Sequence, residues 1–332
     1  MPQGQHSLNR GTSFVGGHKK ALLIGINYTG TDHALNGCIA DVKHMQQFLI
    51  SHRGYKNEKT SMVFMSDEAV DAHHKPTFKN LIAGFQWLVS GNRPGDSLFL
   101  HYSGHGAQMK SDTHPSGMID CLVPLDYQTA GCIDSNVLHK CLVRALPSGV
   151  KLTVVFDCCH SGTMLQLPYT YLPTDGEEGG MQQKVLEAKK VFHEVTGLFS
   201  KGLCVASLET VQEVLADVAN LANLFHHRLE VDAEGYKHEH FTPEIDEENE
   251  TNNLIVVISG CEDDQTSADT QIQGFGSTGA LSYAVQEKLK EGHVTYAGML
   301  QHVRAFMKRS KLSQIPQLSC GTEVDPDGSF EF

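Results

Sequence analysis

Aspartate, cysteine and histidine follow a strongly apolar run in the stretch LTVVFDCCHSG, residues 152–162. A second stretch, LFLHYSGHG at 98–106, likewise runs from apolar residues into serine, histidine and glycine. A cysteine thiolate is a nucleophile, and a nearby histidine can take its proton or protonate a leaving amine. Cys159 and His105 are therefore candidates for a thiol–imidazole pair. The backbone N–H groups of Gly104 and Cys159 are candidates for stabilising an oxyanion.

Side-chain direction separates the two neighbouring cysteines. Residues two apart in an extended strand point to the same side. Asp157 and Cys159 should then face one way and Cys158 the other, and by the same rule Ser103 should share a side with His105. The plainer alternative is that Cys159 is a buried core cysteine and that His105 is a loop histidine. The glycines that flank both motifs favour the catalytic interpretation, because glycine permits sharp turns and close backbone approach.

The elements around these motifs predict an α/β fold. Short apolar runs alternate with helix-like segments, which is typical of a mostly parallel sheet covered on both faces. We expect strands at 21–26, 61–64, 97–102, 121–124, 152–156 and 254–259, and helices at 36–52, 77–90, 135–146, 278–290 and 295–308. Ser135 is the expected N-cap of the third helix. Functional groups in such sheets gather beyond the carboxyl ends of the strands, where both motifs lie.

The chain divides into four stretches. We expect a short N-terminal arm over 1–19, a first part of the sheet domain over 20–167, an insertion or linker over 168–252, and the rest of the same domain over 253–332. The insertion is far longer than an ordinary loop. It ends in a charged run without aromatic residues, EIDEENETNN, which is typical of an exposed linker.

Composition excludes several classes of protein. A formal net charge of -13 argues against a nucleic-acid partner, which a basic face would bind. No apolar run approaches the roughly 20 residues of a membrane span, and no signal peptide is evident. Nine cysteines without a CxxC pair argue against a disulfide framework and a zinc ribbon. We therefore expect a soluble protein of the cytosol or nucleus.

The paired motifs HYSGHG and DCCHSG, with ALLIGINY, LNGCIADVK, DQTSAD and GSTGALS, resemble those of the type I metacaspases, caspase-like cysteine proteases. The resemblance covers roughly 20–166 and 253–319 and implies a caspase-like fold. It also implies endopeptidase activity through a dyad of His105 and Cys159. A substrate pocket for Arg or Lys before the scissile bond falls on Cys38, Asp41, Ser103 and Asp157. The resemblance further implies a monomer, and the insertion, with its basic residues, is the expected site of self-cleavage.

A protein of another class could use the same fold. A catalytically silent or secondary scaffold that binds aggregated protein is the main alternative, because fold alone does not decide function. The intact pair of His105 and Cys159 and the acidic pocket favour the enzyme. No cofactor is expected to be required.

Calcium is the point at which the sequence departs most from the family. Many metacaspases are activated by Ca²⁺ held by acidic side chains near the dyad. Here neutral residues occupy four positions where acids are usual: Ile119, Ser135, Asn136 and Gln166. Asp120, Asp126 and Asp134 could form only a weak site, because calcium needs six to eight oxygen ligands including carboxylates. We expect activity that is independent of calcium or that needs unusually high calcium.

Overall fold

The computed structural model describes residues 17–111, 117–158, 161–173, 181–184, 253–260, 269–272, 276–312 and 314–332. Its centre is an eight-stranded sheet of order β2-β1-β3-β7-β10-β13-β8-β9. The pairings from β2 through to β10 are parallel, and those from β10 to β9 are antiparallel. The strands are β1 (Lys19–Gly25), β2 (Met62–Ser66), β3 (Ser97–Ser103), β7 (Lys151–Asp157), β8 (Tyr169–Pro173), β9 (Met181–Lys184), β10 (Ile255–Ser259) and β13 (Gln317–Cys320).

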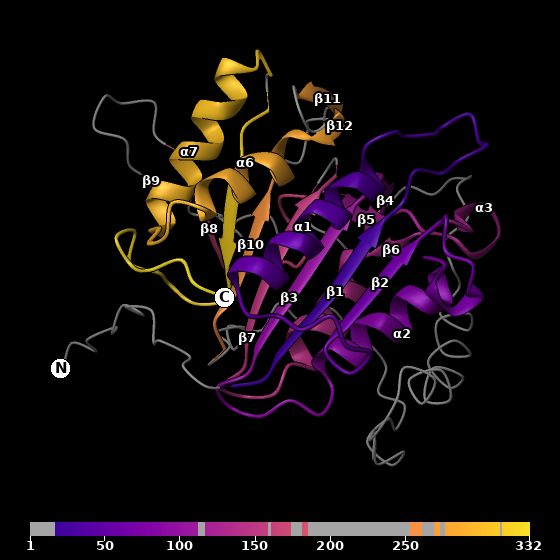
Figure 1. Cartoon of the computed structure of the whole chain (residues 1–332), viewed down its shortest axis with the longest axis horizontal. Helices are drawn as coiled ribbons and strands as arrows, with labels where there is room; N and C mark the ends of the chain where they lie inside the picture. The colour runs from indigo at the N-terminus through magenta and orange to yellow at the C-terminus, as the bar shows by residue number, and fades with distance from the viewer. Residues whose placement is uncertain are drawn as a thin grey trace.

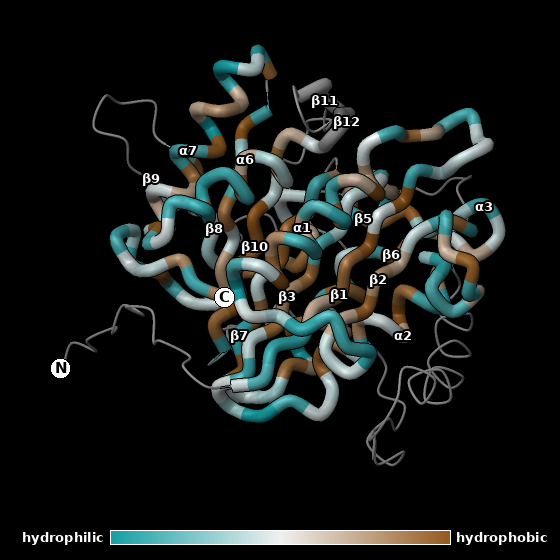
Figure 2. The backbone as a smooth tube through the Cα atoms, in the orientation of Figure 1, coloured by the Kyte–Doolittle hydropathy of each residue, from teal (hydrophilic) through white to brown (hydrophobic). Residues whose placement is uncertain are grey.

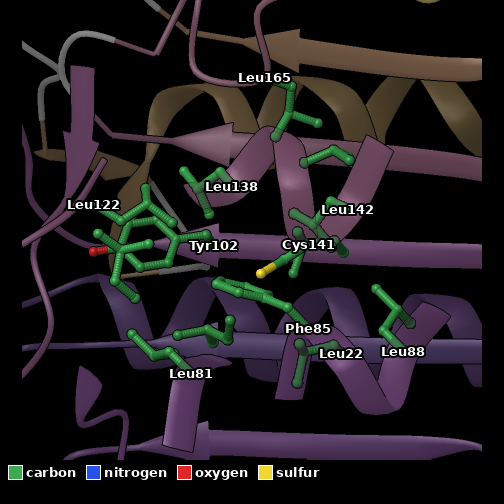
Figure 3. Close-up of a cluster of buried hydrophobic side chains, with 14 of the residues drawn as sticks. Leu22, Leu81, Phe85, Leu88, Tyr102, Leu122, Leu138, Cys141, Leu142 and Leu165 are labelled. Carbon is green, nitrogen blue, oxygen red and sulfur yellow. The ribbon is translucent and has the colours of Figure 1, made fainter. Parts of the chain in front are cut away.

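Helices cover the sheet, as Figure 1 shows, and the predicted fold class is confirmed. The apolar side chains form two main clusters, and the alternation of β3 divides its residues between them: Leu98, Leu100 and Tyr102 belong to one and Phe99 to the other. The first cluster includes α2 (Phe78–Val89) and the second includes α1 (Cys38–His52), α6 (Ala280–Leu289) and α7 (Tyr296–Arg309). Figure 2 shows hydrophobic residues along the central strands, and Figure 3 shows Leu22, Phe85 and Tyr102 within the first cluster.

The sheet extends past residue 167. Strands β8 and β9 come from the beginning of the stretch that the sequence predicts to be an insertion, and β8 pairs with β13 from the end of the chain. Residues 174–180 and 185–252 lie outside the described residues, and the charged run at 244–253 falls almost wholly among them. None of the helices in the described ranges is long and apolar enough to span a membrane.

Two expected elements differ from the structure. The run predicted as a strand at 121–124 is β5 (Met118–Leu122), which pairs antiparallel with β4 (Gly106–Lys110) and β6 (Ile133–Asp134) in a separate sheet. The connection from β4 to β5 is too short for a parallel crossover, so the chain reverses and the pair is antiparallel. An apolar run does not reveal which sheet it joins.

The helix predicted at 135–146 is also different. It consists of α4 (Ser135–Leu138), followed by a π-helical segment, η2 (His139–Arg144). Ser135 is not the N-cap. Asp134 is, because its carboxylate accepts the N–H of Val137 at 2.9 Å. Both residue types cap helices well, so the sequence alone does not choose between them.

A buried histidine makes stability depend on pH. His101 lies in the middle of β3 and is 0% exposed, with its Nε2 2.8 Å from Ser282 Oγ. Burial lowers the pKa of His101 from 6.5 to about 3. Between these two pH values the unfolded chain binds the proton and the folded chain does not, so stability is full above pH 6.5 and is lost as the pH falls.

We expect this titration alone to remove about 2 kcal/mol of unfolding free energy between pH 6.5 and pH 5. Urea unfolding of the wild type and of His101→Gln at pH 7 and pH 5 measures it. The variant should be less stable at pH 7, but its stability should fall less with acid. Equal losses in both proteins would mean that His101 is protonated in the folded state.

Candidate active site

The two motifs meet at the carboxyl ends of two neighbouring strands in the middle of the sheet. β3 and β7 are neighbouring parallel strands, and their last residues, Ser103 and Asp157, are register partners. The parallel strands point toward the part of the molecule where β4, β5 and β12 (Gly276–Gly279) lie (Figure 1). His105 follows two residues after the end of β3. Cys159, the other predicted catalytic residue and oxyanion donor, lies outside the described residues, as does His160.

Cys158 faces the core. Its side chain is 0% exposed and belongs to the cluster that contains Tyr102 and Phe156. Asp157, one position earlier, makes polar contacts instead. The alternation inferred from the sequence therefore holds for Asp157 and Cys158, the two positions that precede the predicted nucleophile.

Asp41 and Ser103 of the expected substrate pocket are in direct contact. Ser103 Oγ donates to Asp41 Oδ2 at 2.7 Å, and both side chains are buried. Asp41 lies in the first turn of α1, where a carboxylate is favoured by the helix dipole. Cys38, the fourth predicted pocket residue, begins the same helix and is also buried.

The N-terminus of α6 meets both predicted pocket carboxylates. The N–H of Gly279, the N-cap residue, donates to Asp41 Oδ1 at 2.8 Å, and the N–H of Ser282 donates to Asp157 Oδ2 at 2.8 Å. The first amides of a helix have no partners within the helix and carry partial positive charge. They therefore offset part of the cost of burying two carboxylates.

Only glycine fits at position 279. A Cβ built there would lie 2.1 Å from Asp157 Oδ2, well inside contact distance. The backbone of residue 279 is thus packed directly against the carboxylate. The GSTGALS motif, which the sequence ties to the family, has a physical reason for its second glycine at this position.

Two buried tyrosines fix the backbone of His105. The N–H of His105 donates to the hydroxyl of Tyr28 at 3.0 Å, and the hydroxyl of Tyr102 donates to the carbonyl of His105 at 2.8 Å. Tyr28 OH in turn donates to the carbonyl of Val123 at 2.6 Å. The Tyr28 backbone is held at a φ of 50°, an uncommon left-handed conformation for a non-glycine residue.

The ring of His105 is held as well. It packs against the Tyr28 ring with 4.6 Å between ring centroids, and its Nε2 lies 2.7 Å from the carbonyl oxygen of His33. A carbonyl oxygen only accepts hydrogen bonds, so this contact places the proton of the neutral ring on Nε2. Nδ1 then carries the lone pair and is the atom able to take a proton.

The amide of Gly104, the other predicted oxyanion donor, points toward β7. Its N–H donates to the carbonyl of Asp157 at 3.5 Å, a long bond. A Cβ at Gly104 would lie 3.0 Å from the Tyr102 hydroxyl and 3.2 Å from the Tyr28 hydroxyl. Gly104 therefore lets both tyrosines approach the histidine loop.

Removing the Tyr28 hydroxyl should slow catalysis without unfolding the chain. Tyr28→Phe keeps the ring against His105 but leaves the His105 N–H without its acceptor. We expect kcat to fall about tenfold with KM little changed, because a small displacement of the predicted catalytic histidine would be costly. Steady-state kinetics over a pH series measures it. Tyr171→Phe is the matched control, since Tyr171 OH accepts the Val324 N–H at 3.1 Å in β8. Equal kinetic loss in both variants would contradict a positioning role.

The carboxylates of the three weak calcium candidates all accept hydrogen bonds from other residues of the protein. Asp126 Oδ1 accepts the N–H of Phe78 at the start of α2 at 2.7 Å, and Asp134 caps α4. Asp120 accepts Gln108 Nε2 at 3.0 Å and Thr163 Oγ1 at 2.5 Å. Within the described ranges, no three or more His, Cys, Asp or Glu side chains form a group able to hold a metal ion.

Sequence reasoning missed the residues that support the site. These are Tyr28, Tyr102, His101 and Ser282, together with the His33 carbonyl. Tyr28 and Tyr102 are part of the motifs ALLIGINY and HYSGHG. Their place in these motifs could therefore have indicated that they contact His105. The contact of Ser282 with Asp157 joins residues 125 positions apart and has no local signal.

Known proteins resemble both the sequence and the fold. The family model "Metacaspase, peptidase C14 domain" matches residues 19–168. Metacaspase-1 of Schizosaccharomyces pombe is 38% identical over 93% of this chain and 68% of that protein. Metacaspase-1 of Mycosarcoma maydis is 39% identical over 96% of this chain and 74% of that protein.

A crystal structure of protein GSU0716 from Geobacter sulfurreducens matches the fold with a TM-score of 0.52 and 19% identity, over 93% of this chain and 95% of that one. That likeness concerns the fold alone. The two metacaspase-1 proteins, by contrast, are similar to this chain over nearly its whole length. The chain therefore belongs to the metacaspases, a family of caspase-like cysteine peptidases.

Proposed function

We propose that this protein is an endopeptidase that cleaves after Arg or Lys through a dyad of Cys159 and His105. The observation that carries the specificity is the pair of buried carboxylates, Asp41 and Asp157, at the edge of the sheet where His105 lies. A buried carboxylate favours a cationic partner, and the planar guanidinium of arginine can bind it with two parallel hydrogen bonds.

The chemistry follows from the orientation of His105. Nδ1 takes the proton of the Cys159 thiol, and the thiolate attacks the carbonyl carbon of the substrate. The C–N bond breaks as the imidazolium returns the proton to the leaving amine. Water then hydrolyses the thioester. The His33 carbonyl holds Nε2–H throughout and stabilises the charged ring. The Gly104 amide, whose bond to Asp157 is long, is the candidate donor to the oxyanion.

Fluorogenic peptides ending in Arg, Lys or Asp test the proposal directly. We expect turnover of the Arg and Lys peptides, with Arg at least as good as Lys, and none of the Asp peptide. Turnover of only the Asp peptide would refute the specificity. No turnover of any peptide by the folded protein would favour the scaffold alternative.

We propose that the enzyme is a monomer of the cytosol or nucleus. Caspase-fold proteases often dimerise through the exposed edge strand of their C-terminal part. Here β13 is not an edge, because β8 pairs with it and β9 pairs with β8. The edge on this side of the sheet is β9, which has only four residues, and so short an edge strand is a poor template for pairing with a second copy.

Self-cleavage is expected in the insertion, residues 168–252, where the basic residues are Lys184, Lys189, Lys190, Lys201, Arg228 and Lys237. Purified wild-type protein should separate into two fragments on a denaturing gel, and Cys159→Ala should remain one band, because only the wild type has the nucleophile. An intact wild-type chain with full activity would show that processing is not required. Fragments that appear equally in Cys159→Ala would assign the cut to another protease.

A further inference from the structure

The segment that follows Cys159 and His160 is tied to the sheet at its start. Ser161 Oγ donates to the Cys158 carbonyl at 3.0 Å. The Gly162 carbonyl accepts from Gln317 Nε2 at 2.6 Å and from Ser319 Oγ at 3.2 Å, both in β13. All of these groups are uncharged, so these bonds do not depend on a bound ion.

The second half of the segment is hydrogen-bonded to β5 and to η2. Thr163 Oγ1 donates to Asp120 in β5, and His139 Nδ1 lies 2.8 Å from the Leu165 carbonyl. Burial lowers the pKa of His139, so its ring is neutral and donates to that carbonyl. The segment is thus anchored from β13, β5 and η2.

Gln166 completes the anchoring. Its Nε2 donates to Ser135 Oγ at 2.8 Å and to Asn136 Oδ1 at 2.9 Å, at the start of α4. Both amide protons of one side chain are therefore used by two acceptors. Gln166 sits at a φ of 50°, a conformation that a non-glycine residue keeps only when its surroundings hold it. We name Gln166, Ser135 and Asn136 the Gln166 clasp.

These residues do not fit a calcium ion. Calcium requires several carboxylate and carbonyl oxygens pointing at one centre. The clasp turns the NH₂ group of Gln166 toward its partners, and its three side chains are neutral. Asp120 already accepts two side-chain donors, while Asp126 and Asp134 serve as acceptors at the starts of α2 and α4.

We infer that the Gln166 clasp holds the segment 161–166, which follows Cys159, without a metal, so that activity is independent of calcium. The inference rests on the proposed protease activity and adds its regulation. Gln166 is a positioning residue: it acts on the proposed nucleophile through the segment 161–166, which its hydrogen bonds anchor.

The first experiment removes the clasp. Gln166→Met keeps the length of the side chain and removes both donors. We expect kcat on an Arg peptide to fall about tenfold to a hundredfold, with KM changed less than threefold. Gln47→Met on the exposed face of α1 is the matched control and should keep wild-type kinetics. Full kcat in a folded Gln166→Met would overturn the positioning role.

The second experiment compares wild-type activity in a chelator with activity in millimolar calcium, and follows the melting temperature across the same conditions. We expect equal activity and an unchanged melting temperature. Activity that needs calcium, or a melting temperature that rises at micromolar calcium, would overturn the inference. Absence of any turnover would instead defeat the proposed function, and the melting measurement would still decide whether calcium binds.

The third experiment builds a site for the ion. The triple variant Ser135→Asp/Asn136→Asp/Gln166→Asp places three carboxylates where the clasp lies. Their repulsion should lower activity in chelator, and millimolar calcium should restore it at least about tenfold. The melting temperature of this variant should rise with calcium, a readout that does not depend on catalysis. A folded triple variant as active in chelator as the wild type would overturn the inference.

Discussion

Replacing Cys159 by alanine should lower kcat by about 10⁴-fold or more, to the background of the assay, because the reaction loses its proposed nucleophile. The change leaves the neighbouring Asp157 and Cys158 in place, so substrate affinity should persist. Steady-state turnover of an Arg peptide measures the first effect, and fluorescence anisotropy of a labelled peptide measures the second.

Cys158→Ala is the matched control, because it removes a thiol one position away. Cys158 is fully buried in the core cluster, so the substitution should leave a small cavity and cost about 1 kcal/mol of stability while most activity remains. Thermal unfolding and kinetics of both variants separate the two outcomes. Equal loss of activity from two folded variants would contradict the assignment of Cys159 as the nucleophile.

Replacing Asp157 by asparagine should lower kcat/KM for an Arg peptide by about 30-fold or more, which corresponds to about 2 kcal/mol. Asparagine keeps an acceptor for the Ser282 N–H, so the contact with α6 survives while the charge is lost. A peptide with citrulline, the neutral analogue of arginine, should be nearly unaffected. The ratio of kcat/KM for the two peptides therefore isolates the charge.

Asp96→Asn is the matched control for this prediction. Asp96 is also buried and accepts two backbone N–H groups, from His18 at 2.7 Å and Arg93 at 2.8 Å, but it lies at the opposite end of β3. It should keep the wild-type preference for arginine over citrulline. An unchanged ratio in Asp157→Asn would mean that Asp157 only caps α6 and that another group reads the substrate.

The sequence predicted what local patterns control. Apolar runs located β1, β3, β7 and β10 because a buried strand leaves a continuous hydrophobic signal. The alternation rule correctly predicted that Cys158 packs in the core cluster and that Asp157 points to the opposite side of the strand, where it accepts the Ser282 N–H. The N-cap of α4 was harder to predict from the sequence. Ser135 and Asp134 are both favourable N-cap residues, and only the hydrogen bond from the Val137 N–H to Asp134 identifies the cap.

What the sequence left open depends on contacts between distant residues. Nothing in the pattern around Asp41 indicates that its second carboxylate oxygen accepts the Gly279 N–H, 238 positions away. Nor does an apolar run such as that of β5 show which sheet it enters. The sequence alone indicated that Gln166 stands where an acid is usual in the family. Its hydrogen bonds to Ser135 and Asn136 are evident only in the folded structure.

The contact between α6 and the two pocket carboxylates also sets the order of events during synthesis. Ser282 follows Asp157 by 125 residues, which the ribosome adds in about 6 to 25 s at 5–20 residues per second. Throughout that interval Asp41 and Asp157 exist without the helix terminus that stabilises their burial. A nascent chain can therefore complete the proposed substrate pocket only after translation has passed α6. A truncated product of this message would carry the proposed dyad residues but not a formed site.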